Sequence, residues 1–330
     1  MTHFLACFPT VLRSALLILV LIAQGWLLAG DVPPTIPEAL SGVDAQVRKF
    51  PGVIGTWGLS IRSGQPLNET QWAAVGSVPV TSFHCVGAFI DADGLAQLAN
   101  LRVESLVLEG CHADGDAVES FARMTALRRL AFSHCRLGPG IAAALARSPA
   151  LEDFSSDHRL VGEGIGIIAS APLLRRIRLG HGAASDRAAK SLEGNRTLEG
   201  VNFWATGAPV LSETGVLSLT TLSGLKSLSF SNTVVTYAGS LHRLKELPLL
   251  TALTLDVVDI SVDDLARVQA DLPQVVIKAT RMTPEQRMKW DLSRAYLEKQ
   301  ADLAARKVAA EASKTDTPTP TPTPSEPIAK

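Results

Sequence analysis

Three histidines are spaced so that their side chains could act together: His134, His158 and His181. Each lies seven residues after the first aliphatic residue of a repeated apolar pattern. A repeating fold would therefore place the three imidazoles in neighbouring units, at one rim of a sheet. Imidazole nitrogens bind metal ions, and Asp157 could add an oxygen ligand or orient an imidazole. A metal site is one interpretation; solvated histidines paired with Asp153 or Asp157 are the simpler one, because the spacing follows from the repeat itself.

Charged, amide and aromatic side chains occupy outward positions of the same central units. They are Glu109, Asp153, Asp157, Arg176, Arg178, Asn202 and Trp204. Outward side chains of a strand are free of core packing, so we expect a ligand-binding face here. The sequence has no nucleophile with a base at motif spacing, no phosphate loop and no metal motif independent of the repeat. These residues therefore predict a binding face rather than an enzyme, and no cofactor is expected.

Two cysteines, Cys111 and Cys135, occupy the same slot in adjacent units. Equivalent positions of neighbouring strands lie about 5 Å apart, inside the window for a disulfide. In an exported protein such a bond would contribute up to ~3 kcal/mol of stability. We favour the alternative of two buried thiols, because side chains stacked in parallel seldom present the Cβ vectors that a disulfide needs.

A repeated apolar pattern positions all of these residues. An aliphatic residue, which we call the lead residue, is followed by large apolar residues three and five positions later, at intervals of 23 to 27 residues. The lead residues are Val103, Leu127, Leu151, Leu174, Leu198, Leu225 and Leu250, with weaker units at Thr56, Val80 and Leu272. A unit this short cannot bury an apolar face alone and must stack on its neighbours, so the pattern predicts a solenoid.

The pattern resembles the leucine-rich repeat family, with its consensus L-x-x-L-x-L-x-x-N/C-x-L. The resemblance covers roughly Thr56 to Lys278. Within the family, the chain resembles ribonuclease-inhibitor-like and bacterial envelope members. The residues at the N/C slot are Cys111, Cys135, Thr206 and Thr233, while Arg159 and Gly182 depart from it. The resemblance implies an α/β solenoid, a horseshoe with parallel strands on the concave face and short helices on the convex face.

The N-terminus has the composition of a targeting segment. Residues 1–30 carry one charge, Arg13, ahead of an apolar run over residues 15–29. That length suits the apolar region of a secretory signal peptide and is short for a spanning helix, although an uncleaved N-terminal membrane anchor is the alternative. We expect an exported protein, periplasmic, in the cell envelope or extracellular, that contacts membrane only through residues 15–29 if they are retained.

The remaining segments flank the solenoid, which we place over residues 53–279. Residues 31–52 are rich in proline and predict a linker, and residues 280–313 predict a long helix that begins at Pro284. Five of its apolar residues could form a stripe along the helix: Met288, Leu292, Tyr296, Leu303 and Val308. They predict a helix that packs on the last repeat or projects from it, with a coiled-coil surface as the alternative. Residues 314–330 form a Thr/Pro-rich tail that cannot build a core.

The charge balance limits the classes of partner. The chain carries 31 basic and 32 acidic residues, a net charge of −1. This balance does not favour nucleic acid or an anionic membrane surface as a partner. We therefore predict an exported, non-catalytic module that binds a protein or an extended polymer on its concave face. The alternatives are a metal-binding or enzymatic protein built on the three histidines, and an architectural component of the envelope.

Overall fold

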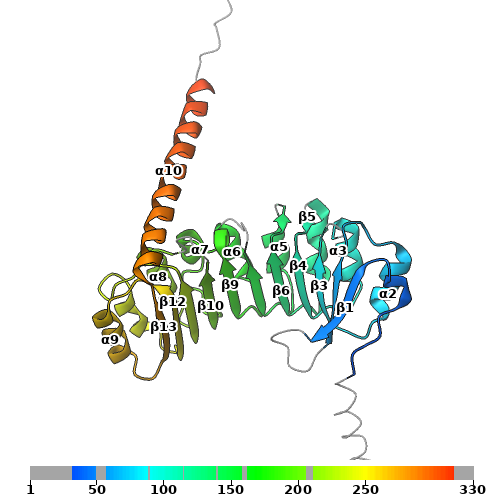
Figure 1. Cartoon of the computed structure of the whole chain (residues 1–330), viewed down its shortest axis with the longest axis horizontal. Helices are drawn as coiled ribbons and strands as arrows, with labels where there is room; N and C mark the ends of the chain where they lie inside the picture. Colours follow the sequence, from blue (N-terminus) through cyan, green and yellow to red (C-terminus); the bar gives the residue numbers. More distant parts are fainter. Residues whose placement is uncertain are drawn as a thin grey trace, which may run out of the picture.

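The chain folds as an open solenoid. The computed structural model describes residues 32–49, 57–87, 90–113, 115–138, 140–157, 162–205 and 211–315. An 11-stranded sheet runs through these residues in the order β1-β2-β3-β4-β6-β8-β9-β10-β11-β12-β13. The strands stand side by side along the long axis of the molecule, and helix α10 projects from one end (Figure 1). The predicted solenoid with parallel strands and short helices is confirmed.

The strands follow the repeat closely. They are β1 (Asp44–Lys49), β2 (Trp57–Arg62), β3 (Ser82–Val86), β4 (Ser105–Glu109), β6 (Arg129–Ser133), β8 (Asp153–Ser156), β9 (Arg176–Gly180), β10 (Gly200–Trp204), β11 (Ser227–Ser231), β12 (Ala252–Val258) and β13 (Val276–Arg281). Two short strands, β5 (His112–Ala113) and β7 (Arg136–Leu137), pair separately just beyond β4 and β6.

Most of the helices cover one face of the sheet. The α-helices are α2 (Glu69–Ser77), α3 (Ala92–Ala99), α4 (Glu119–Arg123), α5 (Ile141–Ala146), α6 (Gly162–Ile168), α7 (Asp186–Ser191), α8 (Glu213–Leu219), α9 (Val262–Asp271) and α10 (Pro284–Thr315). The 3₁₀ helices are η1 (Glu38–Leu40), η2 (Gly115–Val118), η3 (His181–Ala183) and η4 (Leu241–Glu246). Side-chain caps start several of them: the Ser185 hydroxyl accepts from the Ala188 N–H, and Ser261 from the Asp264 N–H.

The core lies between the sheet and the helices. In the central units the residues three and five positions after the lead residue point inward and stand in register with those of the next strand, as Leu130 does with Phe154. Phe154 is fully buried and meets Phe132 edge to face, with ring centroids 6.0 Å apart. Ser156, which breaks the apolar rule, is also fully buried. The core is therefore a stack of shared layers rather than a set of independent units.

Six units carry a left-handed residue, directly after the strand in five of them and within β12 at Val257. The described residues with positive φ seven positions after a lead residue are Gly87, Gly110, His134, His181, Asn232 and Val257. This backbone conformation suits glycine, and among other residues asparagine and histidine tolerate it best. The turn therefore gives a conformational reason for two of the three spaced histidines.

Charges alternate along the sheet edge where the strands begin. One position after the lead residue, successive units carry Glu104, Arg128, Glu152, Arg175, Glu199 and Lys226. Glu152 accepts from Arg128 at 3.0 Å, and Glu199 lies 3.0 Å from both Arg175 and Lys226. Opposite charges on neighbouring strands favour this register over a slipped one.

The N-terminal end differs from the predicted linker over residues 31–52. Strand β1 lies in this range and pairs antiparallel with β2, with Val47 opposite Leu59. Val43, Ala45 and Val47 pack against the core. Their alternation with polar residues suits a half-buried strand, and the prolines that suggested a linker lie before it. The structure thus extends the folded region toward the N-terminus.

The C-terminal end differs from the sequence pattern in register. Ile277 stands opposite Leu253, and Ala279 opposite Leu255, so the last unit starts two residues later than a lead residue at Leu272 would imply. Leu272 is instead the buried C-cap of α9.

Within the described part of the chain, no helix combines the length and the apolar character that crossing a membrane requires.

Candidate ligand-binding face

Asp153 organises the centre of the concave face. Its carboxylate is buried, with 9% of the side chain exposed, and one oxygen accepts from Arg176 Nε at 3.0 Å while the other accepts from Arg178 Nη2 at 3.1 Å. Both arginine side chains remain 53% exposed. A buried carboxylate therefore holds two guanidinium groups in place while leaving part of each open to a ligand.

A third cation stands on the far side of the same carboxylate. The strand register places Arg129 opposite Asp153, and Asp153 opposite Arg176. Arg129 Nε is buried and finds no hydrogen-bond partner among the described residues. One carboxylate thus lies among three cations, Arg129, Arg176 and Arg178, and this part of the face carries a positive local charge.

Two glycines make room for large side chains on this face. A Cβ on Gly200 would lie 3.1 Å from Arg176 Cγ, so the arginine stem lies across this position. A Cβ on Gly180 would lie 2.4 Å from the indole of Trp204, which covers that glycine. The ring also meets His181 edge to face, with centroids 4.7 Å apart. Neither glycine was identified from the sequence, although both occupy outward strand positions where the neighbouring strand carries a large side chain.

Strands β9 and β10 therefore bring together four of the predicted binding residues. Arg176 and Arg178 come from β9, and Asn202 and Trp204 from β10. Asn202 stands opposite Arg178, and Trp204 opposite Gly180. The result is a continuous surface of guanidinium, amide and indole groups, which we call the Arg/Trp patch.

Asp157, one strand away from Gly180, contacts the turn after β6. Its carboxylate accepts from the Ser133 hydroxyl at 2.8 Å and from the His134 N–H at 3.0 Å. It is buried, and His134 Nδ1 lies 3.6 Å from Oδ2. Asp157 thus supports the turn after β6.

Glu109 belongs to another cluster that the sequence did not reveal. Its Oε2 lies 3.2 Å from His84 Nε2, and His84 Nδ1 contacts the Arg48 guanidinium of β1. Because arginine can only donate, Nδ1 must accept, and a neutral ring then carries its proton on Nε2. Burial and the neighbouring Arg48 lower the pKa of His84. A neutral imidazole therefore joins the edge strand to β3 and β4.

The three spaced histidines have different environments where the structure describes them. His134 is 68% exposed beside Asp157, and His181 packs against Trp204. His158 lies outside the described residues. In the described ranges, no group of three His, Cys, Asp or Glu side chains has a geometry that could hold a metal ion. Metal binding by the complete row stays a hypothesis, the alternative to solvated histidines.

Cys111 and Cys135 are free and buried. Cys135 donates to the Leu108 carbonyl at 3.2 Å, and Cys111 lies 3.5 Å from the Glu109 carbonyl. Contact with Cys135, together with burial, raises the pKa of Cys111. The disulfide considered from the sequence is not formed in the structure; both thiols serve main-chain carbonyls around the turn.

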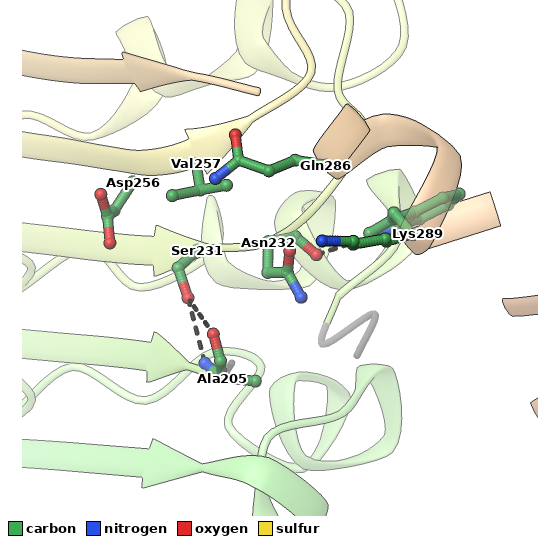
Figure 2. Close-up of a pocket in the computed structure, with 8 residues that line it drawn as sticks. Ala205, Ser231, Asn232, Asp256, Val257, Gln286 and Lys289 are labelled. Atoms are coloured by element: carbon green, nitrogen blue, oxygen red, sulfur yellow. Dashed lines mark hydrogen bonds between the residues drawn. The ribbon is translucent and has the colours of Figure 1, made fainter. Parts of the chain in front are cut away.

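A pocket lies where α10 meets the solenoid. A pocket of about 270 Å³ opens between the ends of β10, β11 and β12 and the first turns of α10. Figure 2 shows Asn232 and Lys289 side by side in it, with Ser231 bonded to Ala205. Trp290 separates this pocket from a hollow of about 670 Å³ beside Arg294. Trp290 was not identified from the sequence because the larger apolar stripe lies on the opposite face of the helix.

The repeat geometry defines the class of fold. Units of one strand and one short helix, stacked into an open parallel sheet, form a solenoid of the leucine-rich-repeat type. No protein-family model matches the chain, and no curated protein matches it.

Several solved structures are similar in fold. TLR13 in a complex with ssRNA13 is 16% identical over 66% of this chain and 31% of that chain, with a TM-score of 0.45. This chain thus spans about a third of that protein. A Bacteroides fragilis protein is 12% identical over 57% of this chain and 67% of that chain (TM-score 0.37). An internalin, InlF from Listeria monocytogenes, is 12% identical over 68% and 81% of the two chains (TM-score 0.34).

Proposed function

We propose that this chain is an exported, non-catalytic module that binds a protein partner through the Arg/Trp patch on its concave face. The observation that carries the proposal is the pairing of Arg176 and Arg178 with the buried carboxylate of Asp153. Arginine and tryptophan dominate the binding energy of many protein interfaces. Side chains already fixed before binding lose less conformational entropy when a partner arrives.

Export is supported by the sequence of residues 1–30, which lie outside the described part of the chain. We expect the mature protein to begin near residue 31 and to be recovered from the cell envelope or the medium. Mass spectrometry of the protein purified with a C-terminal tag tests this. A mass that includes residues 1–30, with the protein in the cytosol, would contradict export and leave the binding proposal intact.

Site-specific cross-linking tests the binding face. A photo-reactive amino acid at Asn202 lies in the patch, and the same group at Lys190 of α7 lies on the helical side as the matched control. We expect a defined protein partner to be cross-linked from position 202 and not from position 190. Equal yields from both positions would contradict a concave binding face.

Charge reversal provides the second arm. Arg176→Glu with Arg178→Glu should abolish the cross-link from position 202. Lys190→Glu in α7 with Arg196→Glu in the segment before β10, two exposed positions outside the strands, makes the same change in net charge and should leave the cross-link intact. Loss of the cross-link in both pairs would indicate a long-range charge effect rather than a binding site.

A further inference from the structure

The Arg/Trp patch has a regular spacing along β9. Arg176, Arg178 and Gly180 are alternate residues of one strand and point to the same side, and Trp204 covers Gly180. At about 3.3 Å per residue, each of the three positions lies about 7 Å from the next. Two cationic groups are thus followed by an aromatic surface at one constant step. An extended peptide has the same step between alternate side chains.

The two arginines keep donors for a ligand. Each guanidinium has five N–H groups, and the structure assigns one contact from each to Asp153. About half of each side chain is exposed. Carboxylates are the groups that such donors bind with charge-assisted hydrogen bonds. The excess of positive charge, with Arg129 on the far side of Asp153, favours a ligand that brings more than one carboxylate.

Negative groups limit the length of an anionic ligand. Glu109 and Asp157 lie on one side of the patch and the exposed Asp256 on the other. The strands between carry small neutral residues such as Ser229. A long polyanion that crossed the sheet would meet these carboxylates, whereas a short acidic stretch within a protein would not. The charge pattern therefore favours an acidic peptide over a nucleic acid or a sulfated polysaccharide.

From this geometry, and resting on the function proposed above, we infer that the ligand is an extended acidic segment of a protein. It carries carboxylates on two alternate residues, which bind Arg176 and Arg178. An apolar or aromatic side chain two residues further on packs against the indole of Trp204.

A set of synthetic peptides tests the inference with the full chain. The parent peptide has the order Asp-Ala-Asp-Ala-Trp and a fluorescent label at the end nearer its aspartates. One control replaces both aspartates by asparagine, a second moves them next to each other, and a third replaces the tryptophan by alanine. Fluorescence anisotropy at low salt should show binding of the parent, weakened about tenfold or more in each control. Equal affinity of the parent and the adjacent-aspartate peptide would overturn the inference.

Variants of the protein separate the two parts of the site. Arg178→Gln should weaken binding of the parent and of the tryptophan-free peptide alike, since both carry the carboxylates. Gly180→Ala displaces the indole and should weaken the parent while changing the tryptophan-free peptide little. Gly64→Ala adds the same methyl group where no atom lies within 4 Å and should change neither affinity. If Gly180→Ala weakened both peptides equally, the assignment of the apolar step to Trp204 would fail.

Competition distinguishes this inference from the proposed function. A heparin fragment or a single-stranded oligonucleotide that displaced the peptide at lower concentration than unlabelled peptide would overturn the acidic-protein class. A partner that cross-links from position 202 but is not displaced by the parent peptide would also overturn the inferred ligand, while supporting the concave binding face.

Discussion

Trp290 donates its indole Nε1–H to the main-chain carbonyl of Asn232, at 2.9 Å. The two residues are 58 positions apart, and both are buried. Arg287 and Arg294 lie over the indole, and Arg287 also pairs with Asp259 of the solenoid. The base of α10 is therefore fixed to the turn after β11, while the rest of the helix projects (Figure 1).

Removing this indole should release the helix. We expect Trp290→Ala to destabilise the docked base of α10 by about 3–5 kcal/mol, as for other buried aromatic truncations. Amide hydrogen exchange over residues 284–296 should become faster, with β3 to β6 unchanged. Leu292→Ala, on the exposed face of the same helix, is the matched control and should alter stability by less than about 0.5 kcal/mol. Unchanged exchange in Trp290→Ala would contradict the docking.

The position of this contact also shows the limit of the sequence pattern. The stripe that predicted packing on the last repeat is exposed at Met288, Leu292, Tyr296 and Leu303. The side chain of Val308 lies outside the described residues. Apolar spacing identifies a face of a helix but not its partner, and here one large indole with a donor on the opposite face fixes the base. The central solenoid was predictable because its period is local and repeats in every layer.

The candidate site was predictable only in part for a similar reason. Alternation along a strand identified Arg176, Arg178, Asn202 and Trp204 as outward residues, and the structure places them together. Alternation does not give side-chain pairing, so the shared carboxylate of Asp153 was not evident. The roles of the two glycines depend on side chains of the neighbouring strand, which a single strand pattern does not contain.

The left-handed turn positions predict opposite effects at equivalent places. Val257 has a φ of 52°, which is unfavourable for a β-branched residue, so Val257→Asn should stabilise the protein by up to about 1 kcal/mol. Gly110 has a φ of 67° and no atom within 4 Å of an added Cβ, so Gly110→Ala should destabilise it by about 1 kcal/mol through strain alone.

Urea unfolding measures both effects. Gly64→Ala, also in open space but without a positive φ, is the control and should be neutral or slightly stabilising. If Gly110→Ala behaved like Gly64→Ala, the turn would not require a left-handed residue.

The alternating charges at the strand starts should contribute in a salt-dependent way. Glu199 lies between Arg175 and Lys226, and hydrogen bonding to Lys226 helps to lower its pKa. Glu199→Lys should lower the melting temperature, and the difference from the parent should shrink between low salt and 1 M NaCl because the charges are exposed to screening. The swap Glu199→Lys with Lys226→Glu should recover part of the loss. A loss that is independent of salt would indicate packing rather than charge.

His84 should make stability depend on pH below neutrality. Its pKa is lowered from 6.5 in the folded protein by burial and by Arg48. As the pH falls below 6.5, the unfolded chain takes up a proton at this position before the folded chain does, so protonation favours unfolding. The contribution of His84 to stability is thus fully present above pH 6.5. It is lost as the pH falls through the lowered pKa that His84 has in the folded protein. Arg48, Arg62 and Glu109 are the charged groups that influence it.

The comparison with His84→Gln isolates this residue from the carboxylates that titrate at lower pH. Urea unfolding of both proteins at a series of pH values gives the free energy of unfolding of each. Relative to the variant, the parent should become less stable as the pH is lowered from 7 to about 5. Amide exchange of β1 should rise with it, because a protonated imidazole would face the Arg48 guanidinium and weaken the join between β1 and β3. A parent that gained stability relative to His84→Gln on acidification would show that the charged imidazole is the favoured form.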